Sequence, residues 1–206
     1  MRKLIVLLVM ICASGFVFGQ NLQYGIKTGL SFASQSIDDP NIISKNSVST
    51  YFITGYVEKP LKHSFYFEAG LGIAGKGVTT FDNSQTSTYQ LTYLDIPLDL
   101  LYKFSIPALG KLYVGAGPYI SAGLSGNVQY ENTNNSTGLA IEYGKDNDYK
   151  RIDAGANFAA GFELNNHLTF NTNYSLGLNN IAPDNPNDGI NSIKNRVFSI
   201  GLGLFF

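Results

Sequence analysis

Residues 198–206, at the end of the chain, read FSIGLGLFF, with a large apolar side chain at every second position. The apolar members of this terminal segment are Phe198, Ile200, Leu202, Leu204 and Phe206. Between them stand Ser199, Gly201 and Gly203, with Phe205 next to the last residue, so the opposite face carries mostly small side chains. Because side chains alternate between the two faces of a β-strand, this pattern predicts a strand with one apolar face and one small-residue face.

The same alternation recurs at seven places earlier in the chain. The expected strands span about residues 22–33, 51–57, 65–76, 93–104, 112–124, 152–164 and 168–178. In the segment 51–57 the phase is ambiguous, because Phe52 and Tyr56 compete with the opposite set of Tyr51, Ile53 and Val57. With the terminal segment, the pattern predicts eight strands, which is an even number.

The connections between these strands alternate between long and short. Long ones, rich in Asn, Asp, Ser and Thr, are expected at residues 35–47, 77–89, 126–150 and 179–193. Short ones are expected at residues 59–62, 105–110 and 165–166. Long loops at one end and tight turns at the other are typical of an up-and-down barrel, so the sequence predicts an all-β, eight-stranded antiparallel barrel.

The composition indicates which face of this barrel is outside. A soluble barrel such as a lipocalin would turn its apolar face inwards and expose the other face. Here that other face is mostly Gly, Ser, Asn and Tyr, and only 14% of the chain is charged, against about 25% in soluble domains. We therefore expect a transmembrane barrel with its aliphatic face in lipid. Aromatic side chains expected to form an interfacial girdle at the short-turn end are Tyr24, Phe65, Tyr102, Phe104, Phe162, Phe170 and Phe206.

The first nineteen residues have the features of a secretory signal peptide. Arg2 and Lys3 precede a short apolar run, and small residues lead to Gly19, which predicts cleavage before Gln20. The mature barrel would then span residues 20–206 and contain no cysteine, since the one cysteine is Cys12. Both ends of the mature chain are expected in the periplasm and the long loops outside the cell.

The terminal segment, with its final Phe206, resembles the signal that the barrel assembly machinery of Gram-negative outer membranes reads. The chain as a whole resembles the small outer-membrane β-barrel family common in Bacteroidetes, which includes PorT-like proteins. The pieces that carry this resemblance are residues 19–20, 24–29, 94–98 and 115–119. The resemblance implies an outer-membrane location, contact with outer-membrane lipids and lipopolysaccharide, and the assembly machinery as a partner during insertion.

Several charged side chains have the parity of the small-residue face and are expected inside the barrel. This predicted lumenal cluster consists of Lys27, Glu68, Asp95, Asp99 and Lys103, with Asp153 and Glu163 at the same parity. Buried charges are costly unless they are paired or hydrated, so we expect Lys27 to pair with Glu68 or Asp99. A salt-bridge plug and an ion pathway are the two alternatives for this cluster.

The remaining features bear on the class of function. A formal net charge of −1 gives no basic field for nucleic acid, and no metal-ligand or cofactor motif is expected. His63 and His167 follow short turns, whereas a lipid-modifying enzyme would need its histidine at the opposite rim. The sequence therefore predicts a non-enzymatic barrel with a structural or binding role carried by extracellular loops. The alternatives are an accessory subunit of a secretion or envelope assembly, with an unknown envelope protein as partner, and a lipid-modifying enzyme.

Overall fold

The computed structural model describes residues 22–206, apart from 39–43, 83–84, 133–134, 145–147 and 185–191. The expected signal peptide, residues 1–19, lies outside the described residues. Within the described part, no helix is long and apolar enough to cross a membrane.

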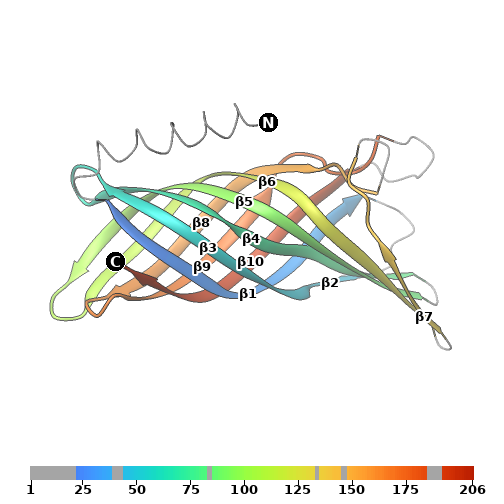
Figure 1. The fold of residues 1–206 in the computed structure, drawn as a ribbon, viewed down its shortest axis with the longest axis horizontal. Helices are drawn as coiled ribbons and strands as arrows, with labels where there is room; N and C mark the ends of the chain where they lie inside the picture. Colours follow the sequence, from blue (N-terminus) through green and yellow to red (C-terminus); the bar gives the residue numbers. More distant parts are fainter. Residues whose placement is uncertain (1–21, 39–43, 83–84, 133–134, 145–147, 185–191) are drawn as a thin grey trace, which may run out of the picture.

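The described chain is almost entirely β-structure (Figure 1). Its strands are β1 (Gln23–Asp38), β2 (Ser44–Asn46), β3 (Val48–Pro60), β4 (Phe65–Asp82), β5 (Gln85–Ile106), β6 (Gly110–Asn132), β7 (Asn135–Ala140), β8 (Ile152–Leu164), β9 (Leu168–Gly177) and β10 (Ser192–Phe205). Eight of them form a ring in the order β1-β3-β4-β5-β6-β8-β9-β10, and every neighbouring pair is antiparallel. The ring closes where β10 pairs with β1, from Gly25 opposite Phe205 to Asp38 opposite Ser192. The predicted eight-stranded up-and-down barrel is confirmed.

The two ends of the barrel differ. At one end, which we call the short-turn end, residues 61–64, 107–109 and 165–167 connect the strands. His63, Ser64, Ala108 and His167 adopt positive φ in these turns. The beginning and end of the barrel lie at the same end, since the Phe206 amide donates to the Tyr24 carbonyl at 2.8 Å and the Phe205 amide to His167 at 3.1 Å. We call the opposite end the hairpin end.

The hairpin end corrects the expectation of long loops. Residues 77–82 and 85–89 are the two paired arms of a β-hairpin, because β4 and β5 stay paired up to Asp82 opposite Gln85. Much of the expected loop 126–150 is likewise strand, since β6 runs to Asn132 and β7 pairs back onto it. These segments are rich in Thr and Tyr, which favour strands. Their polar character reflects a position beyond the part of the barrel whose outer face is apolar. Backbone pairing keeps these segments extended (Figure 1, right).

The strand lengths define how far this hairpin end projects. A tilted strand needs about ten residues to cross the hydrocarbon of a membrane. β5 has 22 residues and β6 has 23, so each continues about as far again beyond such a crossing. On β5, the outward-facing side chains are apolar from Phe104 back to Leu94 and then change to Thr92, Gln90 and Thr88.

The outer face of the ring carries exposed aliphatic and aromatic side chains. Those on β1 and β10 are Tyr24, Ile26, Leu30, Phe32, Phe198, Ile200, Leu202 and Leu204, with Phe206 just beyond β10. In β3, Tyr51 and Ile53 are exposed, whereas Phe52 and Tyr56 are buried inside, which settles the phase of that strand. At the short-turn end the rings of Phe65, Tyr102 and Phe104 form an edge-to-face series on the outer surface, with centroids 5.0 and 4.7 Å apart.

Candidate functional site: the polar interior of the barrel

Among the described residues, three lysines are buried in the interior, and they lie at three successive levels along the barrel. The level nearest the short turns is built around Lys103 on β5. Its Nζ lies 2.7 Å from Glu58 Oε2 on β3 and also pairs with Glu163 on β8. The Tyr66 ring lies 4.6 Å from the same ammonium, so a cation–π contact supplements the two ion pairs.

The middle level is built around Lys27 on β1. Its Nζ donates to both carboxylate oxygens of Glu68 on β4, at 2.7 and 2.6 Å, and lies 4.2 Å from the centre of the Tyr56 ring. Asp99 on β5 is the direct cross-strand neighbour of Glu68. Its Oδ2 accepts a hydrogen bond of 2.9 Å from Asn157 Nδ2 on β8.

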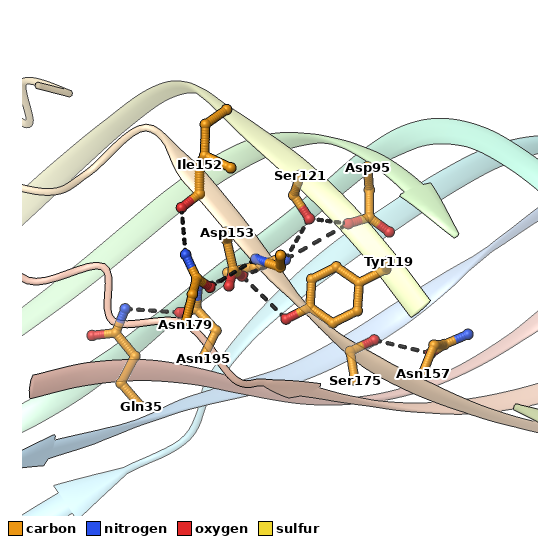
Figure 2. A network of polar contacts seen from close by, with 12 residues as sticks. Gln35, Asp95, Tyr119, Ser121, Ile152, Asp153, Asn157, Ser175, Asn179 and Asn195 are labelled. Carbon is orange, nitrogen blue, oxygen red and sulfur yellow. Dashed lines mark hydrogen bonds and ion pairs between the residues drawn. The ribbon is translucent and has the colours of Figure 1, made fainter. Parts of the chain in front are cut away.

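The third level, towards the hairpin end, is built around Lys76 on β4. Its Nζ lies 2.8 Å from Asp153 Oδ2 and 3.6 Å from Asp95 Oδ1, and it donates to Ser121 at 2.9 Å. Figure 2 shows that Asp153 gathers partners from several strands: Tyr119 donates to it at 3.2 Å and Asn195 at 2.9 Å. This network joins β4, β5, β6, β8 and β10 across the interior.

Above the third level an apolar cluster fills the barrel mouth at the hairpin end. Barrel residues in this apolar cap are Ile37, Val78, Leu91, Tyr93, Val128 and Ile193; residues between strands are Ile141, Tyr149, Ile181 and Ala182. Hydrogen bonds fix the inserted segments, since the Ile181 amide donates to the Ile193 carbonyl and the Lys150 amide to the Ile181 carbonyl, both at 2.9 Å. Burial raises the pKa of the Tyr149 phenol, so it remains a neutral donor to Gln35 Oε1 at 3.3 Å.

A small polar cavity of about 60 Å³ lies between the middle and third levels. Its charged lining comprises Lys27, Lys76, Glu68, Asp95 and Asp99. Asn157, Asn173, Ser175 and Ser199 add amide and hydroxyl groups. The lining is therefore hydrophilic on several sides, and the volume suffices for a few water molecules.

The structure brings only part of the predicted lumenal cluster together. Lys27 pairs with Glu68, whose cross-strand neighbour is Asp99. Lys103 pairs instead with Glu163. Asp95 and Asp153 belong to the separate level of Lys76. Lys76 and Glu58 were not in the predicted cluster. Lys76 shares the inward parity of Glu68, and Glu58 shares that of Phe52 and Tyr56, so parity is the signal that could have found both.

The other predicted residues lie elsewhere. Phe198, Ile200, Leu202, Leu204 and Phe206, the predicted assembly signal, form the exposed outer face at the end of the chain. His63 and His167 are exposed in the short turns. Among the described residues, no three His, Cys, Asp or Glu side chains are arranged to hold a metal ion.

A search of curated protein sequences finds no match. Among solved structures, the chain is similar to Ail, the attachment invasion locus protein of Yersinia pestis, at 12% identity and a TM-score of 0.44, over 91% of this chain and all of that one. It is also similar to Neisserial surface protein A (10% identity, TM-score 0.47, 91% of this chain and all of that one). The outer membrane protein OprG from Pseudomonas aeruginosa matches at 13% identity and a TM-score of 0.45, over 89% of this chain and 95% of that one.

The family comparison covers most of the chain. Residues 18–182 match the model of the outer membrane protein beta-barrel domain. This range includes the barrel strands from β1 to β9 and all three lysine levels. The chain belongs to the outer membrane protein beta-barrel domain family, and it is an outer-membrane β-barrel protein.

Proposed function

We propose that this outer-membrane protein is a closed barrel that acts by presenting its hairpin end outside the cell for binding. The observation that carries the proposal is the contrast between a filled interior and long hairpins. Ion pairs and an apolar cap occupy the interior, whereas β4, β5, β6 and β7 extend a polar sheet beyond the apolar band.

The orientation follows from the general architecture of such barrels, which have short turns in the periplasm and longer connections outside. We infer that the signal peptide, residues 1–19, is removed on export and that both ends of the mature chain remain periplasmic. The outer aliphatic face then contacts outer-membrane lipids and lipopolysaccharide. The outward Phe206 and its alternating neighbours would be read by the barrel assembly machinery.

The interior supports a structural role for its charges. Each lysine is paired with a carboxylate on another strand, so the ion pairs cross-link the ring. In an eight-stranded barrel the side chains nearly fill the interior. We therefore propose a non-conducting lumen and no catalytic activity. The resemblance of residues 24–29, 94–98 and 115–119 supports a place near the PorT-like branch of the family.

Single-cysteine labelling tests the orientation, since the only cysteine, Cys12, lies in the expected signal peptide. Gln129 is exposed on the projecting part of β6, and Lys62 is exposed in a short turn. A membrane-impermeant maleimide should label Gln129→Cys on intact cells and Lys62→Cys only after the outer membrane is opened. The reverse pattern would contradict the proposal.

Site-specific photo-cross-linking in living cells tests the binding role at the same two positions. We expect adducts from a photoreactive residue at position 129 and none from position 62. Adducts formed only at position 62 would favour an accessory subunit of an envelope assembly that is contacted from the periplasm. No adduct at position 129 would contradict a binding function of the hairpin end.

A further inference from the structure

We propose that the cavity between the middle and third lysine levels binds one small monovalent metal cation, of the Na⁺ or K⁺ class, at the carboxylate of Asp99. The inference is independent of the proposed surface function. It rests on the charge balance of the cavity, on a buried acceptor of a lining residue that receives no hydrogen bond from the described chain, and on the chemistry of the remaining lining.

The charges that line the cavity do not balance. Two lysines, Lys27 and Lys76, face three carboxylates, those of Glu68, Asp95 and Asp99. Lys27 is engaged by Glu68 at 2.6 Å, and Lys76 by Asp153 at 2.8 Å and Asp95 at 3.6 Å. None of the ion pairs among the described residues includes Asp99. Asp99 is therefore the lining carboxylate that lacks an ion-pair partner on the described chain.

The neighbouring strand increases the need for a counter-charge. Glu68 and Asp99 stand directly opposite each other on β4 and β5. Like charges at directly opposed positions destabilise a sheet. Lys27 donates hydrogen bonds to both oxygens of Glu68, so its ammonium group is bonded to only one of the two opposed carboxylates.

Asp99 also has an acceptor that remains unused within the described part of the chain. The residue is only 2% exposed. Asn157 donates to Oδ2, but no described group donates to Oδ1, which is shielded from bulk solvent. Since buried charges in proteins are paired or coordinate metals, a cation beside Oδ1 would satisfy both the charge and the acceptor.

The lining suits a hard monovalent ion. Besides Asp99, the cavity lining includes Thr54, Asn173 and Ser199, whose side-chain oxygens can bind a cation. Hard cations prefer oxygen ligands. A volume of about 60 Å³ has room for an ion with accompanying water. The single uncompensated carboxylate, and the lack of a metal-holding group of three His, Cys, Asp or Glu among the described residues, favour a monovalent ion over a divalent one.

Refolding in matched salts tests the proposal, because the ion can then enter before the barrel closes. The mature chain would be refolded from urea into detergent micelles in NaCl, KCl or N-methyl-D-glucamine chloride at one ionic strength. Binding of an ion to the folded state alone raises its stability. We expect the wild type to unfold several degrees higher in NaCl or KCl than in the organic salt. Asp99→Asn, which keeps an oxygen for Asn157, should lose this shift, whereas the control Asp38→Asn, at an exposed position, should keep it.

A direct measurement holds even if Asp99→Asn fails to refold. Crystals of the wild-type protein grown with Rb⁺ should show anomalous density in the cavity, next to Asp99. Equal unfolding temperatures in the three salts, or no density at Asp99, would overturn the proposal and indicate that a proton neutralises the carboxylate. A salt shift that persists in Asp99→Asn would also overturn it, because the ion would then bind elsewhere.

Discussion

Tyrosine rings that lie over glycines fill much of the barrel interior. A side chain added at Gly25 would collide with the Tyr56 ring. One at Gly161 would meet the Tyr113 ring as well as a backbone carbonyl, and one at Gly155 would meet the Tyr119 ring as well as a backbone carbonyl. These tyrosines also lie near the buried ammonium groups, as Tyr119 does at 4.4 Å from Lys76. At these positions a glycine on one strand gives the space that a tyrosine ring on another strand occupies.

A substitution at one of these glycines should be costly. In Gly161→Val an added Cβ would lie 2.3 Å from the Phe170 carbonyl oxygen and 2.4 Å from the Tyr113 hydroxyl oxygen, so both the paired strand and the ring would have to shift. Overpacking of this kind costs about 1–3 kcal/mol. Ala160→Val, one position away on the outer face of β8, is the matched control and should change stability little. Urea unfolding in lipid vesicles measures both, and equal stability of the two variants would contradict the packing described for Tyr113.

The pair of Lys27 and Glu68 gives a second prediction at this scale. Lys27→Met leaves the Glu68 carboxylate buried without its cation, which should lower the free energy of unfolding by about 3 kcal/mol. Adding Glu68→Gln to Lys27→Met should restore most of that loss, because the stranded charge is then removed. A double variant as unstable as the single one would show that Lys27 stabilises the barrel through packing alone.

At the scale of the strands, period-two alternation was sufficient to predict the ring. It gave the outward faces of β1, β4, β5, β6 and β10 because lipid on one side and a confined interior on the other impose opposite residue types. It did not give the hairpins beyond the apolar band. There both faces of residues 77–89 are polar or mixed, so hydrophobicity no longer distinguishes a strand from a loop.

The last strand carries the prediction that belongs to this scale. Phe206 is 74% exposed on the outer side, whereas Phe205 is partly buried and its ring lies 5.1 Å from that of His167. Phe206→Ala should therefore reduce insertion into the outer membrane more than Phe205→Ala does. Heat-modifiable migration of the protein in outer-membrane fractions measures the inserted share. Equal insertion of both variants would contradict a role of the outward terminal aromatic in assembly.

At the scale of the whole molecule, the interior depends on contacts that a one-dimensional pattern does not encode. Parity places Lys103 and Glu163 inside, but strand register decides which carboxylate meets which lysine. The sequence did not place Glu58 inside the barrel, because Tyr51 and Phe52 are both large and aromatic and leave the inward face of β3 ambiguous. The apolar cap was missed because Ile141, Tyr149 and Ile181 are isolated within polar segments, and only the folded chain gathers them at the hairpin end.

The three lysine levels and the apolar cap together support our proposal that the barrel does not conduct ions. Three lysine-centred levels and the apolar cap occupy successive heights of an interior that eight strands leave barely wide enough for side chains. Conductance of the purified wild-type protein in planar lipid bilayers tests this claim most directly. We predict no steady channel of large conductance. A reproducible open pore in the wild type, left unchanged by Lys27→Met, would contradict the account.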